Sequence, residues 1–216
     1  NALNTSFGQA HSFSKIKNYD DFKNHIPVRD YEDLREYFEQ IKEGKKNVLW
    51  PGKPLYLAVT SGTTSGSKYI PITKQSLPNH LNGAKTALLM YVAETGKVDF
   101  INGKFIFIQG SPVLSKISGI LTGRLSGISA HHTPFYMKKN MLPSWSTNII
   151  EEWENKIESI VKETMEANMT IISGIPSWLQ MYFEKIVDKT NKKVSEIFPN
   201  FNLLVYGGVN FDPYKN

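Results

Sequence analysis

The chain has 216 residues, of which 40% are hydrophobic and 21% are charged, as is typical of a globular domain. Lys and Arg number 25 against 20 Asp and Glu, and this small excess forms no basic stripe, which argues against nucleic-acid binding. Cysteine is absent, which excludes disulfide scaffolds and thiolate chemistry, and without a signal peptide or a membrane-length apolar run we expect a cytoplasmic protein.

The first third of the chain predicts a helix followed by two short strands. Aromatic and aliphatic side chains recur at helical spacing over 31–41, where Asp30 can cap the start and Gly44 can end the helix. Apolar, partly β-branched runs at 55–59 and 69–73 predict two strands.

The rest of the chain alternates between helical and extended patterns. The expected elements are a helix over 77–92, a strand over 104–108, a helix over 148–166, a strand over 169–172, a helix over 177–189 and a strand over 203–206. Strands that alternate with helices imply right-handed crossovers, so we predict an α/β fold with a mostly parallel sheet and crossover helices. Glycine or small polar residues follow the last three strands, at 109–111, 173–174 and 207–208. Ligands bind at such strand ends in open α/β sheets, so the three ends should border one crevice.

A polar loop separates the first two predicted strands. Its residues are Thr60, Ser61, Gly62, Thr63, Thr64, Ser65, Gly66, Ser67 and Lys68. The glycines allow the backbone to approach a ligand closely, and exposed N–H groups and hydroxyls can donate to anionic oxygens. Lysine adds a mobile positive charge, so the loop suits a polyphosphate.

The loop does not fit a Walker motif, which has four residues between its glycines and a lysine directly after the second. Here three residues separate Gly62 from Gly66, and Ser67 precedes Lys68. Pro71 lies within an extended pattern, so we expect the loop to join two strands rather than to lead into a helix. A solvated turn that happens to contain lysine is the alternative.

The ordered loop resembles the phosphate loop of the adenylate-forming superfamily, which includes acyl-CoA synthetases, peptide-synthetase adenylation domains and luciferases. The additional Ser65 makes the loop more similar to that of one branch of the superfamily. This branch is the acyl acid–amido synthetases, first known as plant auxin-responsive proteins. Further segments that match this branch are 4–8, 26–28, 69–73, 174–178 and 206–214.

The resemblance implies an ATP-dependent ligase that needs Mg²⁺. A carboxylic acid would attack the α-phosphate of ATP, and an amine, typically an amino acid, would then take the acyl group to form an amide. Residues Thr60 to Lys68 would hold the β- and γ-phosphates. The segment that would lie against adenine consists of Gly207, Gly208, Val209, Asn210 and Phe211.

The family's next motif, which binds the α-phosphate and the metal, is not found in this sequence. We therefore expect 1–216 to be an incomplete N-terminal ATP-binding domain of a protein roughly twice as long, as the resemblance implies, with the C-terminal domain elsewhere. No catalytic residue or metal ligand is assigned. A ligase that passes the acyl group to a thiol such as coenzyme A, and a nucleotide-binding module without chemistry, are the alternatives.

Several side chains have both a functional and a packing interpretation for the acyl substrate. Arg124 could pair with a substrate carboxylate, Tyr136 and Trp145 could form pocket walls, and Ile175 and Pro176 follow a predicted strand end. The Ser- and Gly-rich stretch over 111–126 contains no serine-hydrolase elbow, and either lines the acyl pocket or forms a plain loop and helix.

Two further patterns are interpreted as structural. His131 and His132 have no third ligand at a suitable spacing, so a packing role is preferred to a metal site. An aromatic and methionine stripe at helical spacing is interpreted as core, and it consists of Trp178, Met181 and Tyr182.

Overall fold

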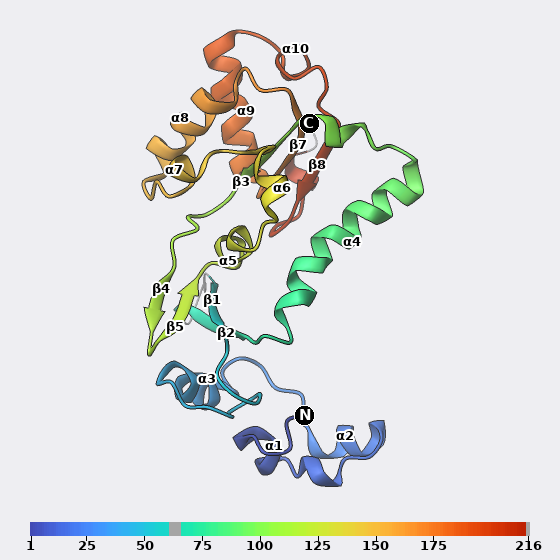
Figure 1. Ribbon diagram of the computed structural model, residues 1–216, viewed down its shortest axis with the longest axis vertical. Coiled ribbons are helices and arrows are strands. Elements are labelled where there is room, and N and C mark those ends of the chain that lie inside the picture. The colour runs from blue at the N-terminus through green and yellow to red at the C-terminus, as the bar shows by residue number, and fades with distance from the viewer. Residues whose placement is uncertain (61–65, 215–216) are drawn as a thin grey trace. The chain divides into compact units, whose positions relative to one another are not determined.

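The computed structural model describes residues 1–60 and 66–214 (Figure 1). The chain divides into two compact units. The first contains Asn1–Asn82 and Val113–Ile128, and the second contains Gly83–Pro112 and Ser129–Asn216. Among the described residues, no helix is long and apolar enough to cross a membrane.

The first unit is built on a mixed sheet with the strand order β2-β1-β5-β4. Its strands are β1 (Tyr56–Thr60), β2 (Lys68–Ile72), β4 (Ser115–Ile117) and β5 (Ile120–Gly123). The pairs β1–β2 and β4–β5 are antiparallel, whereas β1 and β5 run parallel. The helices that belong wholly to this unit are α1 (Ser6–Ala10), η1 (Phe13–Lys15), α2 (Tyr19–His25) and α3 (Arg35–Lys42).

The two faces of β1 are both buried. Leu57 packs into one hydrophobic cluster with Phe38 and Ile41 of α3, and Ala58 packs into a second cluster with Ile72 of β2. Successive side chains of a strand point to opposite faces, so adjacent residues supply the two clusters. Burial on both faces therefore explains why the sequence of this strand is a continuous apolar run.

Helix α3 begins later than the sequence pattern predicts. The side chain of Asp30 accepts a hydrogen bond from the N–H of Asp33 at 3.0 Å, and Asp33 accepts one from the N–H of Asp30 at 3.2 Å. This reciprocal pair stabilises a turn over 31–34, so Asp30 caps the turn rather than the helix. The expected end is confirmed, because Gly44 follows the helix with a φ of +91°.

The second unit is built on an all-parallel sheet with the strand order β6-β3-β7-β8. Its strands are β3 (Lys104–Ile108), β6 (Met141–Leu142), β7 (Met169–Gly174) and β8 (Leu203–Tyr206). Its helices are η2 (Asp99–Asn102), α6 (Phe135–Lys138), α7 (Trp145–Asn148), α8 (Trp153–Thr164), α9 (Pro176–Thr190), α10 (Val194–Ile197) and η3 (Asp212–Tyr214). Helices α4 (Leu77–Thr95) and α5 (Leu125–His131) cross the division between the units.

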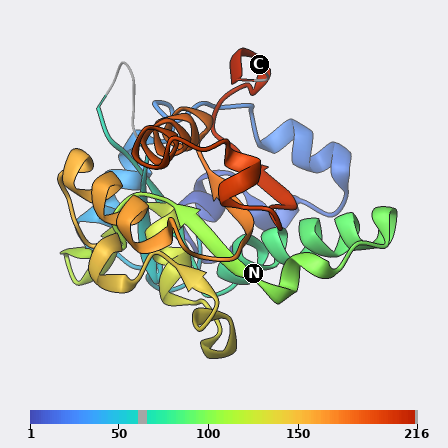
Figure 2. The same ribbon diagram turned by 90° about the horizontal axis from the view of Figure 1, so that it is seen from above.

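These elements confirm the predicted α/β class, with the strands divided between a mixed and an all-parallel sheet. Helix α4 ends before Gly96, which has a φ of +68°, as predicted. The core of the second unit lies between the sheet and the pair of helices α8 and α9. Figure 2 shows these helices from a second direction. The predicted core stripe is confirmed for two of its residues, because Tyr182 is fully buried and Trp178 packs against the same cluster, whereas Met181 is half-buried.

A β-bulge sets the register between β3 and β7. Lys104 pairs with Met169, but Phe105 pairs with Ile171, so Thr170 is the additional residue. Its buried hydroxyl donates a hydrogen bond to the carbonyl of Phe100 at 2.5 Å. The bulge therefore has a buried polar anchor outside the ladder.

The helix predicted over 148–166 is wrong at its start, where the chain forms two helices, α7 and α8. The side chain of Glu152 accepts hydrogen bonds from the N–H groups of Glu154 and Asn155 at 2.9 and 2.7 Å, which begins α8. The buried ammonium of Lys156 donates to the carbonyl of Asn148, the last residue of α7, at 2.7 Å. These side-chain contacts satisfy backbone groups at both helix ends and stabilise the break.

Candidate functional site

The polar loop connects two antiparallel neighbours of the first unit. Strand β1 ends at Thr60, β2 begins at Lys68, and these two residues are paired. The prediction that the loop joins two strands is therefore confirmed, and the strand-to-helix geometry of a Walker motif is excluded. Five residues expected to bind phosphate lie outside the described residues: Ser61, Gly62, Thr63, Thr64 and Ser65.

The described flanks of the loop are accessible. Thr60, Gly66 and Ser67 are exposed, and Lys68 is half-buried. Gly66 has a φ of +82°, and a Cβ added there would meet no atom of the described residues within 4 Å. The backbone conformation, not crowding, therefore favours glycine at this position.

An aromatic side chain lies beside the lysine of the loop. The Nζ of Lys68 is 5.1 Å from the centroid of the Tyr31 ring. The hydroxyl of Tyr31 accepts a hydrogen bond from the N–H of Tyr69 at 3.0 Å. Sequence reasoning missed this contact, because Tyr31 is far from Lys68 along the chain and was interpreted only as part of a helical stripe.

Three strand ends of the second unit lie in one row. Ile108 at the end of β3 pairs with Gly174 of β7, which pairs with Tyr206 at the end of β8. This confirms that the glycine-marked ends of these strands border one edge of the sheet. The segments that follow β7 and β8 accordingly meet there, because a Cβ added at Gly208 would lie 3.7 Å from the Cγ1 of Ile175.

The segment expected to contact adenine forms an aromatic surface after β8. The ring of Phe211 stacks on that of Tyr206, with centroids 4.6 Å apart. Asn210 stabilises the turn, because its Oδ1 accepts from the N–H of Asp212 and its Nδ2 donates to the Asp212 carboxylate, each at 3.1 Å. Tyr206 and Val209 are half exposed, at 50% and 48%. The arrangement offers a flat, accessible surface of the kind that stacks on an aromatic ring.

The acyl-substrate candidates are distributed between the units. Arg124 follows β5 in the first unit and is exposed. Tyr136 lies on α6 of the second unit and is 71% exposed. Ile175 and the buried Pro176 begin α9 at the row of strand ends. Their roles toward a substrate stay predictions.

The histidine pair shows a packing contact. The Nε2 of His131 lies 2.9 Å from the carbonyl oxygen of Pro112, and its ring packs edge-on against Trp145 with centroids 5.1 Å apart. Within 1–60 and 66–214, no group of three His, Asp or Glu side chains could hold a metal ion. The predicted structural role of His131 is confirmed by these contacts.

The stretch over 111–126 is not a plain loop and helix, because much of it forms the β4–β5 hairpin, and its expected contact with an acyl group stays a prediction. Its two turn residues, Ser118 and Gly119, have φ values of +46° and +81°. Two left-handed residues match the right-handed twist of a tight hairpin. A Ser–Gly pair between short apolar runs was the available signal.

A cavity of about 330 Å³ also lies within the first unit, at the end of the β1–β2 pair remote from the polar loop. Pro54 before β1, Pro71 on β2 and Trp50 contribute to its lining. None of the described flanking residues of the polar loop, Thr60 and 66–68, lines it.

The family model and the sequence relatives agree on one family. The model "GH3 family N-terminal domain" matches residues 1–150. The chain is 36% identical over 63 residues to the "Indole-3-acetic acid-amido synthetase GH3.15" of Arabidopsis thaliana, and 28% identical over 105 residues to the "Jasmonoyl--L-amino acid synthetase JAR6" of Nicotiana attenuata. These alignments cover 28% and 47% of this chain, but 11% and 18% of those proteins.

The solved structure "AtGH3.15 acyl acid amido synthetase in complex with 2,4-DB" has the same fold, with a TM-score of 0.66 at 16% identity. The match covers 90% of this chain and 36% of that one, so the chain spans about a third of this relative's length. The family model covers more than half of the chain, and the protein therefore belongs to the GH3 family.

Proposed function

We propose that this chain supplies the ATP-binding part of a ligase that adenylates a carboxylic acid and transfers the acyl group to an amine, typically an amino acid. The observation that carries the proposal is the Thr60–Lys68 loop between paired antiparallel strands, in a chain of the GH3 family. Relatives named as amido synthetases support the reaction class.

The loop is proposed to bind the β- and γ-phosphates of ATP. Gly66 adopts a conformation that favours glycine, the exposed Thr60 and Ser67 offer hydroxyls, and Lys68 offers a positive charge. Such hydroxyl and ammonium donors would complement the negative charge of the outer oxygens of these phosphates. Mg²⁺ would be held through the phosphates and would neutralise part of their charge, and we assign no residue of this chain to it.

Adenine is proposed to lie against Gly207, Gly208, Val209, Asn210 and Phe211. A Cβ added at Gly207 would meet no atom within 4 Å in the part of the chain that the structure describes, so the backbone there is open to a flat ring. The acyl group is proposed to contact Ile175 and Pro176, with Arg124 and Tyr136 as further candidates.

The reaction would proceed in two displacements. A carboxylate oxygen attacks the α-phosphorus of ATP, the bond to the β-phosphate oxygen breaks, and pyrophosphate leaves with the bonding electrons. The amine nitrogen then attacks the acyl carbon, AMP leaves, and the nitrogen loses a proton as the amide forms. The loop would stabilise the charge that develops on the departing pyrophosphate.

We further propose that the chain acts as the N-terminal portion of a longer enzyme, whose other parts bind the metal and complete the active site. The supporting observation is that the chain spans 36% of the length of a solved relative. The intact mass of the protein made from the natural gene tests this, because a mass near 24.5 kDa would contradict it.

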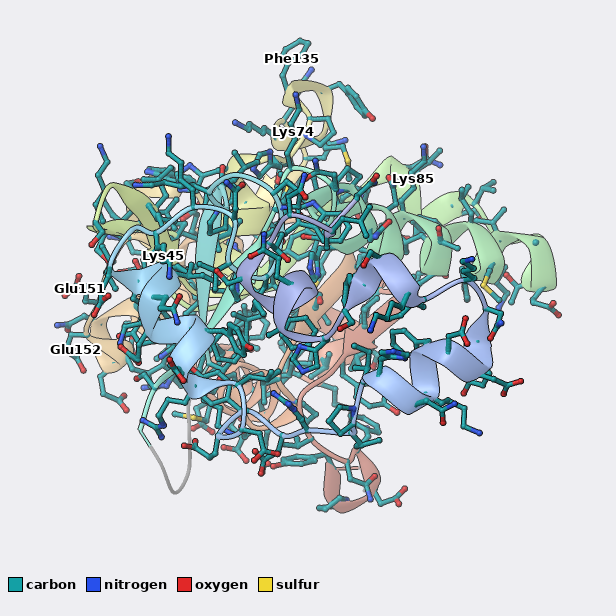
Figure 3. The ribbon with its side chains drawn as sticks, turned by 90° about the horizontal axis from the view of Figure 1, so that it is seen from below. Lys45, Lys74, Lys85, Phe135, Glu151 and Glu152 are labelled. Atoms are coloured by element: carbon teal, nitrogen blue, oxygen red, sulfur yellow. The ribbon has the colours of Figure 1, made fainter. Side chains whose placement is uncertain are left out.

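The reaction is tested by ATP–pyrophosphate exchange with a panel of carboxylic acids, using the protein made from its natural gene. We expect exchange with at least one acid and a large loss in Lys68→Ala. Lys74→Ala is a matched control, because this exposed lysine lies just beyond β2 (Figure 3). Equal exchange in both variants would contradict the phosphate-loop assignment.

The acceptor is identified by adding amino acids or coenzyme A once exchange is established. An amide product supports the proposal, and a thioester indicates the coenzyme A alternative. ATP binding without exchange for any acid would indicate a nucleotide-binding module without chemistry.

A further inference from the structure

We propose that Tyr31 is a positioning residue for Lys68, which it holds beside the polar loop without neutralising its charge. This inference rests on the proposed function of the loop in binding the β- and γ-phosphates of ATP. It assigns to Tyr31 an effect on polyphosphate binding that its place in a helical stripe does not suggest.

The backbone of Lys68 is fixed, but its side chain needs a separate support. Pairing with Thr60 holds its Cα in the β1–β2 ladder. A lysine side chain has a flexible four-carbon stem and loses much conformational entropy when its ammonium is held in one place. The ring of Tyr31, 5.1 Å from Nζ, provides a cation–π contact that reduces this freedom before a ligand arrives.

Tyr31 is itself held from two sides. Its ring stacks on that of the buried Phe38, with centroids 4.5 Å apart and an interplanar angle of 19°. Its hydroxyl accepts a hydrogen bond from the backbone N–H of Tyr69, the residue after Lys68. Strand β2 is at the edge of its sheet, so this hydroxyl satisfies a backbone donor that no strand pairs. The Tyr31 ring and the backbone of β2 next to Lys68 are therefore both held in place.

A second cation–π contact fixes the same end of β2. The Nζ of Lys42, near the end of α3, lies 4.7 Å from the centroid of the Tyr69 ring. Glu39 accepts hydrogen bonds from this ammonium at 2.8 and 3.0 Å. Lys42 is thus neutralised by a carboxylate, and its contact serves to pack α3 against β2.

Lys68 differs from Lys42 in this respect. Among residues 1–60 and 66–214, no carboxylate forms an ion pair with Lys68. An ion pair would compete with a phosphate for the ammonium, whereas a ring quadrupole attracts the cation and leaves its charge available. This contrast between neighbouring lysines points to a polyanionic ligand for Lys68.

The test compares ligands that contain the outer phosphates with one that lacks them. In the protein made from its natural gene, Tyr31→Leu should raise the Kd of ATP and of inorganic pyrophosphate about two- to fivefold, the factor set by one exposed cation–π contact. The Kd of AMP should not change, because AMP has no β- or γ-phosphate. A variant that merely folds poorly would weaken all three ligands together.

Two variants separate the ring from its surroundings. Tyr31→Phe keeps the ring but removes the hydroxyl, so its Kd for ATP should stay close to that of the wild type. Tyr37→Leu removes a ring that packs against the same hydrophobic cluster without contacting Lys68, and it should leave the ATP-to-AMP preference unchanged. In a Lys68→Ala background, Tyr31→Leu should have no further effect on ATP binding.

The outcomes distinguish this inference from the proposed function. Normal ATP binding in Lys68→Ala would refute the phosphate-loop assignment and the inference with it. Weakened ATP binding in Lys68→Ala, but equal losses of ATP and AMP in Tyr31→Leu, would refute the inference alone. Tighter ATP binding in Tyr31→Leu would also refute it, because the ring would then compete with the phosphate.

Discussion

Gly207 and Gly208 are adjacent, yet the structure predicts opposite consequences for their replacement by alanine. Gly208 has a φ of +90°, whereas Gly207 is outside the left-handed region. An added Cβ at 208 would lie at ordinary contact distance, 3.7 Å, from the Cγ1 of Ile175, and one at 207 would meet nothing within 4 Å. Neither methyl group is expected to clash with the protein.

The magnitudes follow from the backbone conformations. Gly208→Ala should lower the free energy of unfolding by about 1–2 kcal/mol, because an L-residue is strained at positive φ. Gly207→Ala should leave stability unchanged or raise it by about 0.4–1 kcal/mol through a less flexible unfolded chain. The same methyl group would separate adenine from the backbone, so the Kd of ATP should rise on the order of tenfold, as when a base loses a stacking contact of about 1–3 kcal/mol.

Guanidinium denaturation and calorimetric titration with ATP measure the two effects in the same protein preparations. The informative results are a loss of stability in Gly208→Ala alone and a loss of ATP affinity in Gly207→Ala without a loss of stability. Wild-type stability in Gly208→Ala would refute the backbone argument. Wild-type affinity in Gly207→Ala would refute the adenine assignment, whatever its stability.

Three further predictions concern stability. Burial raises the pKa of Tyr182, outweighing its hydrogen bond with Thr164, so the free energy of unfolding should fall as pH rises above about 10, and Tyr182→Phe should abolish that decline in pH-dependent denaturation. Hydrogen bonds from the backbone N–H groups of Asn155 and Glu154 lower the pKa of Glu152, so Glu152→Gln should destabilise the protein at pH 7, with the difference shrinking as pH falls below 4.5. Glu151→Gln, at the adjacent side chain labelled in Figure 3, is the control, and an equal effect there would contradict this. Gly83→Ala, in the exposed interior of α4, should raise the free energy of unfolding by about 0.8–1 kcal/mol, and a lowered denaturation midpoint would count against it.

The sequence predicted best the short apolar strands that are followed by glycine or polar residues. Strands β3 and β8 have the predicted limits, because each is an apolar run that ends at polar or glycine residues. The break between α7 and α8 could not be seen in the same way. Ile150 continues the helical spacing, and the interruption depends on where Glu152 and Lys156 direct their side chains.

The parts of the candidate site that are continuous in the sequence could be predicted from it, and the contacts between distant residues could not. The polar loop and the segment after β8 are continuous in the sequence, so residue types and spacing were sufficient to propose them. The contact of Tyr31 with Lys68 depends on how α3 packs against β2, which no local pattern encodes. The distribution of strands between two sheets likewise depends on pairing between distant segments.

The bulge at Thr170 has a consequence for how this family can change. Deleting that one residue would leave Lys104 beside Met169 and Phe105 beside Ile171, so the ladder would keep its register and lose only the bulge and the hydrogen bond to Phe100. Gly174 would therefore keep its place beside Ile108 and Tyr206 at the other end of the strand. The start of β7 can therefore lose this one residue without moving the strand ends, at the cost of one buried hydrogen bond.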